Sequence, residues 1–187
     1  NVLSKAINKY KKSKQKIVIA VCGKYNGLHD AYKSILEAFI HSGIFHNTHI
    51  KVKWIDTEKL EKEKDIDSIF SNVNGVLIPG GFGNRGIEGK IMASKFAREN
   101  QIPFLGICLG MQCAVIDFAR HECSLNNANS AEFDSRTKHR VIDIMTKQKK
   151  VKNKGATMRL GNYNCFIKKK SFAYEAYKST SINERHR

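Results

Sequence analysis

The sequence predicts an α/β domain built on a doubly wound, mostly parallel sheet, with helices on both faces in three α/β/α layers. Short apolar runs alternate along the chain with longer segments whose apolar residues recur at three-to-four spacing. Glycines stand at the points where these runs give way to the helical segments. Strand, helix, strand, helix in this order is typical of a parallel sheet.

The first strand and helix are expected near the N-terminus. Residues 17–21 form an apolar, largely β-branched run, which favours a strand buried on both faces. Asp30 can cap the helix predicted over residues 31–39 and beyond, and Gly43 is predicted to stop it. Residues 1–16 are lysine-rich, and we interpret them as the remnant of a linker from a preceding domain, so that the domain itself spans residues 17–187.

Further strands and helices follow in the same alternation. Residues 50–54 alternate apolar and basic side chains, while residues 75–79 and 103–107 are continuous apolar strands. The helices are expected over residues 87–100 and 109–119. The central part of the sheet is therefore predicted to end near Arg120.

The pattern changes in the last third of the chain. Residues 141–145 are predicted as a strand, and residues 157–161 and 164–167 as an antiparallel addition to the sheet. Residues 147–154 form a lysine-rich connection. No closing strand or helix follows residues 183–187 in the sequence, so the domain is predicted to be incomplete at its C-terminus.

Composition narrows the class of protein. The 187 residues are 41% hydrophobic and 27% charged, which fits a globular domain and excludes disordered and collagen-like chains. No run of about 20 apolar residues and no secretory signal is present, so a cytoplasmic protein without membrane contact is expected. Five cysteines without a C-x-x-C pair predict neither a disulfide framework nor a metal site.

The net charge of +16 raises nucleic acid as an alternative partner. The lysines concentrate in three runs, over residues 5–16, 147–154 and 168–170, instead of lining one helical face with interleaved aromatic side chains. Solvated lysine runs are the favoured interpretation, and no nucleic acid is predicted. A basic nucleic-acid-binding module stays open as the alternative from a different class.

The sharpest chemical feature is Cys108, which stands where a predicted buried strand turns into a helix. Gly106 and Gly110 flank it, and we call residues 106–110 the cysteine elbow. Such a junction lifts a nucleophile above the carboxyl edge of the sheet, with a backbone N–H next to it for an oxyanion. Residues 79–83, Pro-Gly-Gly-Phe-Gly, end the neighbouring strand at the same edge. This glycine loop is not a phosphate-binding P-loop, but it can offer a second N–H to the same pocket.

These motifs resemble the class I, triad-type glutamine amidotransferases, and further signatures resemble the glutaminase domain of CTP synthases. The match spans residues 17–187, and its anchors are Gly23-Lys24-Tyr25, Asp30-Ala31-Tyr32-Lys33-Ser34, the glycine loop with Asn84-Arg85-Gly86-Ile87-Glu88-Gly89, Gly106-Ile107-Cys108-Leu109-Gly110-Met111-Gln112, Ser130-Ala131-Glu132-Phe133 and Thr157-Met158-Arg159-Leu160-Gly161.

The resemblance implies a flavodoxin-like fold and a reaction. Cys108 would be the nucleophile that attacks the side-chain amide of L-glutamine, giving a thioester and ammonia. Gly81, Leu109, Gln112 and Glu132 would bind glutamine, with the N–H groups of Gly81 and Leu109 as the oxyanion hole. A carboxylate at Glu132 also makes independent chemical sense, because it could pair with the α-ammonium of glutamine. Another cysteine hydrolase of the same fold is the alternative enzyme.

The resemblance also implies parts that this sequence does not contain. Ammonia would pass to a synthetase domain of the same polypeptide, where ATP, Mg and UTP bind and UTP is aminated to CTP; the whole enzyme would be a homotetramer. The connection over residues 146–155 is shorter than the family's lid, which contributes to activation by GTP as an effector. The activating His-Pro-Glu motif would follow Arg187, and His186 is not that base, so weak or no glutaminase activity is expected of the chain alone.

Overall fold

The structure is a computed structural model that describes residues 2–24, 32–143 and 162–185. The chain forms two compact units, Asn1–Asp143 and Ile144–Arg187. Among the described residues, no helix is long and apolar enough to span a bilayer.

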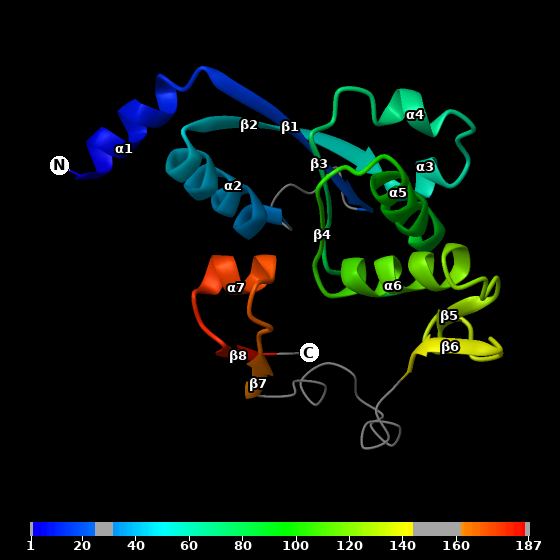
Figure 1. Cartoon of the computed structure of the whole chain (residues 1–187). Coiled ribbons are helices and arrows are strands. Elements are labelled where there is room, and N and C mark those ends of the chain that lie inside the picture. The colour runs from blue at the N-terminus through cyan, green and yellow to red at the C-terminus, as the bar shows by residue number, and fades with distance from the viewer. Residues whose placement is uncertain (1, 25–31, 144–161, 186–187) are drawn as a thin grey trace. The chain divides into compact units, whose positions relative to one another are not determined.

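The first unit is built on a four-stranded sheet in the order β2-β1-β3-β4, shown in Figure 1. All neighbouring strands are parallel. The strands are β1 (Gln15–Gly23), β2 (Thr48–Asp56), β3 (Gly75–Ile78) and β4 (Phe104–Gly106). The chain moves outward from β1 to β2 and then returns to β3 on the other side of β1. This reversal confirms the predicted doubly wound sheet and its flavodoxin-like strand order.

Helices precede, connect and follow these strands, and they cover both faces of the sheet. They are α1 (Val2–Lys11), α2 (Lys33–His46), α3 (Thr57–Leu60), α4 (Ile66–Ile69), α5 (Ile87–Glu99) and α6 (Leu109–His121). Ala20, Val21 and Cys22 are consecutive in β1 and all have 0% exposure. Because successive side chains of a strand point to opposite faces, both faces of β1 must be covered. The apolar run at residues 17–21 predicted this burial.

Two apolar clusters hold the first unit together. The larger one joins the sheet to α5 and the α3–α4 segment, with Phe70 stacked on Phe96 at 4.6 Å between ring centroids. The smaller one lies between α5 and α6 and includes Leu109, Cys113 and Ile116. This second cluster fixes α6, and therefore its first residue, against the rest of the unit.

The predicted helix stop at Gly43 is wrong. Gly43 lies inside α2 and is buried, and an added Cβ would come within 2.6 Å of the Thr48 carbonyl oxygen. The helix instead ends at Asn47, which has φ 53° and donates its N–H to the carbonyls of Gly43 and Ile44. Gly43 is therefore needed for close packing, whereas Asn47 takes the left-handed conformation that ends the helix. Asp30, the predicted cap, lies outside the described residues.

Two short strands complete the first unit. β5 (Ala128–Ser130) and β6 (His139–Ile142) form a separate parallel pair. The predicted strand near residue 141 is present but begins at His139, and β5 falls in a stretch whose polar residues predict a loop.

The second unit consists of β7 (Asn162–Phe166), α7 (Phe172–Tyr177) and β8 (Ser181–Arg185). β7 and β8 form an antiparallel two-stranded sheet of their own. The strand predicted near residue 164 is thus confirmed, but its described partner is β8. Strand β8 extends to Arg185, which pairs with Asn162 of β7. Residues 147–154 and 157–161 lie outside the described part of the chain.

Candidate active site

Cys108 occupies the junction between β4 and α6 in a backbone conformation that residues other than glycine rarely adopt. Its φ and ψ are 52° and −106°, it is the N-cap residue of α6, and it is exposed. Backbone strain of this kind persists only where the surrounding structure enforces it. Strand β4 and the cluster under α6 supply that constraint, and they hold the thiol at the carboxyl edge of the sheet as the sequence predicts.

The two glycines of the cysteine elbow are required by close packing. A Cβ on Gly106 would lie 2.5 Å from the carbonyl carbon of Gly110, and a Cβ on Gly110 would lie 2.2 Å from the Ile78 carbonyl oxygen. Both distances are shorter than any ordinary contact. The first turn of α6 therefore packs directly on the backbone of β3 and β4, which leaves Cys108 no room to relax into the helix.

The glycine loop lies against the cysteine elbow, as predicted from the shared sheet edge. A Cβ on Gly80 would lie 3.5 Å from the Cβ of Cys108, and one on Gly81 would lie 3.6 Å from a methyl carbon of Leu109. The Ile107 N–H donates to the Ile78 carbonyl at 2.9 Å, which ties the two strand ends together. The structure therefore brings Cys108, Gly81 and Leu109 into one place.

Leu109 can contribute only its backbone to chemistry at Cys108. Its side chain is 4% exposed and belongs to the cluster between α5 and α6. As the first residue of α6, it has no acceptor within the helix for its N–H, whereas Gly110 donates to Ile107 and Gln112 donates to Cys108. Among the described residues, the Leu109 N–H thus has no acceptor within α6, and it lies beside the thiol.

The two remaining predicted residues are less closely tied to the thiol. Gln112 is half-buried one helical turn after Cys108, so the two side chains share a face of α6. Glu132 is exposed in the turn after β5, where its backbone N–H donates a hydrogen bond to the Ser130 hydroxyl oxygen at 3.2 Å. In the described part of the chain, no hydrogen bond or ion pair joins the Glu132 carboxylate to the cysteine elbow.

Strand β5, which carries the turn with Glu132, is fastened to α6. Arg120 donates through Nε to the Ala128 carbonyl at 2.8 Å and makes a two-point ion pair with Glu88 of α5, at 2.7 and 3.2 Å. Sequence reasoning missed this arginine because its partners lie elsewhere in the chain. Its position near the end of α6 sets where the Glu132 turn begins.

His121 and Asp117 form a pair that resembles a base and its orienting acid, but they lie at the wrong end of α6. The His121 Nδ1 is 2.9 Å from Asp117, which is 1% exposed and also accepts two hydrogen bonds from Arg98, at 3.0 and 3.2 Å. The hydrogen bond to Asp117 raises the pKa of Arg98. Thirteen residues of helix place His121 roughly 20 Å from Cys108. The trio braces α5 against α6.

The other cysteines of the first unit differ from Cys108 in burial. Cys22 and Cys113 are fully buried, and burial raises the pKa of both thiols, that of Cys113 to about 12. Cys123 is exposed but lies beyond the end of α6. Cys108 is thus the cysteine of this unit that combines exposure with a place at the sheet edge.

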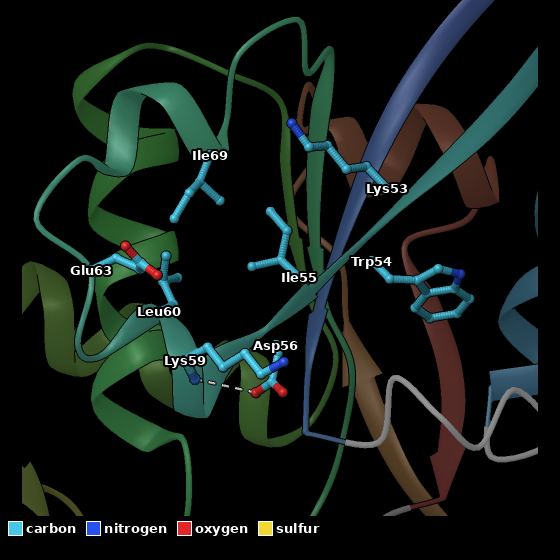
Figure 2. A pocket seen from close by; sticks show the side chains of 8 residues that line it. All are labelled: Lys53, Trp54, Ile55, Asp56, Lys59, Leu60, Glu63 and Ile69. Atoms are coloured by element: carbon cyan, nitrogen blue, oxygen red, sulfur yellow. Dashed lines mark hydrogen bonds between the residues drawn. The ribbon is translucent and has the colours of Figure 1, made fainter.

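A separate hollow of about 430 Å³ lies beside β2, α3 and α4 (Figure 2). Figure 2 shows Ile55 and Ile69 facing each other across it, with Lys53 at its rim and Trp54 on the other side of β2. Trp54 packs on Tyr32 at 5.5 Å between ring centroids. None of the predicted glutamine-site residues lines this hollow. The elbow and its loop, and not the volume of a cavity, identify the candidate site.

Comparison with known proteins agrees with this geometry. The sequence model of the family "Glutamine amidotransferase class-I" matches residues 28–187. A CTP synthase of Caldanaerobacter subterraneus is 50% identical over 97% of this chain and 34% of its own length; one of Chlorobium phaeobacteroides is 56% identical over 91% and 30%. The chain therefore spans about a third of the length of these relatives.

A solved structure shows the same fold. It is the glutaminase domain of Trypanosoma brucei CTPS with bound acivicin, which matches with a TM-score of 0.80 and 38% identity, over 91% of this chain and 66% of that one. The cysteine elbow, the strand order and the family match agree with one another. The chain belongs to the class I glutamine amidotransferase family.

Proposed function

We propose that this chain is the glutamine-hydrolysing part of a CTP synthase. The observation that carries the proposal is the backbone of Cys108, an exposed cysteine kept at positive φ at the start of α6 and against Gly80. The similarity to CTP synthases over nearly the whole chain supplies the choice of substrate.

In the proposed reaction, the Cys108 sulfur attacks the side-chain amide carbon of L-glutamine. A C–S bond forms and the carbonyl electron pair moves to oxygen, where the N–H groups of Gly81 and Leu109 stabilise it. The C–N bond then breaks, and the nitrogen leaves as ammonia with an added proton. Water hydrolyses the γ-glutamyl thioester to glutamate and restores the thiol.

In this scheme, the backbone of the glycine loop and of the first turn of α6 supplies the N–H groups that stabilise the oxyanion. Gln112 lies on the same helix face as Cys108 and would contact the substrate, and the carboxylate of Glu132 would bind its α-ammonium. The proton for ammonia is assigned to the histidine of the downstream His-Pro-Glu motif that the resemblance implies. His121 is hydrogen-bonded to Asp117 and lies at the far end of α6 from Cys108, so it cannot deliver this proton.

The remaining steps belong to parts of the polypeptide outside this chain. Ammonia would pass to the synthetase domain, where ATP, Mg and UTP bind and UTP becomes CTP, with GTP as an effector and a homotetramer as the assembled enzyme. This chain has no P-loop motif, so no ATP-dependent step is assigned to its residues.

The proposal is tested with the chloroketone analogue of glutamine and intact-mass spectrometry. The Cys108 thiolate displaces chloride, so a C–S bond forms, a C–Cl bond breaks and the mass rises by one adduct. We expect a single adduct on Cys108, suppressed by excess L-glutamine and absent from Cys108→Ser. Cys123→Ser is the matched control, because Cys123 is exposed but outside the elbow. Labelling of Cys123 at the same rate, or no protection by glutamine, would contradict the proposal.

A further inference from the structure

Lys24 links the central strand of the sheet to the glycine loop. It is the first residue after β1, and its Nζ donates a hydrogen bond to the Phe82 carbonyl. The side chain is half-buried, and a Cβ added to Gly83 would lie 3.7 Å from the same Nζ. The ammonium group therefore sits in the bend of the loop, where Gly83 has φ 81°.

This link joins a rigid element to a segment with little stiffness of its own. Strand β1 pairs with strands on both sides, and its last residues are fully buried. The loop contains Gly80, Gly81 and Gly83, and glycine restricts the backbone less than any other residue. A hydrogen bond from an ammonium group is stronger than one between neutral partners. Lys24 thus holds the loop at Phe82, one residue from Gly81.

Other contacts fix the far end of the same connection but not this part. Gly86 and Gly89 pack on Thr57, and Arg85 pairs with Glu58 at 3.5 Å. These contacts hold residues 85–89 to α3. Among the hydrogen bonds described for the loop, the bond from Lys24 is the one that reaches Phe82, next to the proposed oxyanion donor.

We propose that Lys24 is a positioning residue for glutamine hydrolysis: by holding the Phe82 carbonyl, it keeps the Gly81 N–H aimed at the site where the oxyanion forms. The inference rests on the proposed function of Cys108 and Gly81. Lys24 does not touch the substrate in this role. Its loss should therefore weaken the step that develops charge on the carbonyl oxygen and leave the thiol itself in place.

Two reagents separate these effects. The chloroketone of glutamine places a carbonyl oxygen in the proposed oxyanion hole, whereas iodoacetamide alkylates a thiol without needing that hole. Labelling rates at Cys108 are measured for the full chain with both reagents in the wild type, Lys24→Met, Lys24→Arg and Lys62→Met. Lys62 is an exposed lysine beyond α3 and is the matched control.

We expect the maximal labelling rate of Lys24→Met with the chloroketone to fall by about tenfold. This is less than the roughly 100-fold loss from removing an oxyanion donor, because the Gly81 N–H is displaced and not deleted. The concentration for half-maximal rate and the iodoacetamide rate should stay within about twofold of the wild type. Lys24→Arg should recover most of the chloroketone rate, since it keeps the donor and the charge, and Lys62→Met should match the wild type.

Three results would overturn the inference. An unchanged chloroketone rate in Lys24→Met means that the loop does not need Lys24. An equal fall with both reagents means a general structural role, and Lys24→Gln gives the same comparison if Lys24→Met does not fold. Absence of chloroketone labelling at Cys108 in the wild type overturns the proposed function first and this inference with it, so the two failures are distinguishable.

Discussion

Two strand-to-helix junctions meet at the candidate site, and they differ in length and in the residue that takes the unusual backbone conformation. Between β3 and α5, residues 79–86 form a long connection in which glycines supply the unusual conformations, with φ 81° at Gly83 and 69° at Gly86. Between β4 and α6, only Ile107 and Cys108 intervene, and the unusual conformation falls on the cysteine itself.

The two junctions differ in the contacts that hold their backbone in place. In the long connection, glycines take the unusual conformations and side chains from other elements contact the backbone, Lys24 and Thr57 among them. In the short one, the close packing of Gly106 and Gly110 on neighbouring backbone forces Cys108 to φ 52°. The long junction is held by side chains from other elements, whereas the short one is held by direct backbone packing.

The largest change in the free energy of unfolding is expected from a substitution that adds a methyl group to the tightly packed short junction. In Gly110→Ala, the new methyl group would meet the Ile78 carbonyl oxygen at 2.2 Å, so we expect a loss of about 3 kcal/mol in the free energy of unfolding. Urea unfolding followed by fluorescence of Trp54, the single tryptophan, measures it. Gly80→Ala is the matched control because its methyl group would lie 3.5 Å from the Cβ of Cys108, an ordinary van der Waals distance. Equal stability of the two variants would contradict the packing argument.

A substitution at Gly86 should destabilise the long junction. Gly86→Ala places a methyl group 2.4 Å from Thr57 Oγ1 at φ 69°, and we expect a loss of about 2 kcal/mol. Thr57→Ala removes this hydroxyl, which is buried and has no hydrogen-bond partner among the residues that the structure describes. In a double-mutant cycle, part of the loss should therefore be recovered. Strict additivity would show that the contact with Thr57 is not the cause.

A substitution that relieves the backbone strain at Cys108 should raise the stability of the protein and abolish its reaction with the chloroketone. Glycine adopts φ 52° without strain. We therefore expect Cys108→Gly to raise the free energy of unfolding of the first unit by about 1 kcal/mol and to abolish chloroketone labelling. Urea unfolding and intact mass measure the two effects. Cys113→Ala is the contrasting variant, since it empties a buried site and should destabilise the protein. A less stable Cys108→Gly would mean that the elbow is not strained.

The last effect develops only above pH 9 and concerns the buried thiol in the cluster that fixes α6. Burial raises the pKa of Cys113 to about 12 from the usual value of 9.0, so the native state keeps a proton that the unfolded state loses above pH 9. Its stabilising contribution is complete below pH 9 and is lost as the pH rises from 9 toward 12. The stability difference between the wild type and Cys113→Ala should therefore shrink over this range in urea unfolding. A constant difference would contradict the prediction.

Much of the candidate site at the sheet edge was predictable because it depends on residues close in sequence. The run at residues 17–21 lies within β1, and the spacing of Gly106, Cys108 and Gly110 placed Cys108, the proposed nucleophile, at the start of α6. Gly43 shows the limit of the same reasoning. A glycine near the end of a helix predicts a stop, but here it makes room for the Thr48 carbonyl, and Asn47 ends the helix.

The sequence by itself determined the alternation of strands and helices, the cysteine elbow and the glycine loop beside it, because backbone conformation and burial periodicity are local properties. Only the tertiary structure decided how these parts are held. Lys24 and Phe82 are 58 positions apart, Arg98 and Asp117 are 19 apart, and Gly110 is required because it packs on Ile78 of another strand. Such contacts depend on strand order and helix packing, which bring distant residues together and which no local pattern specifies.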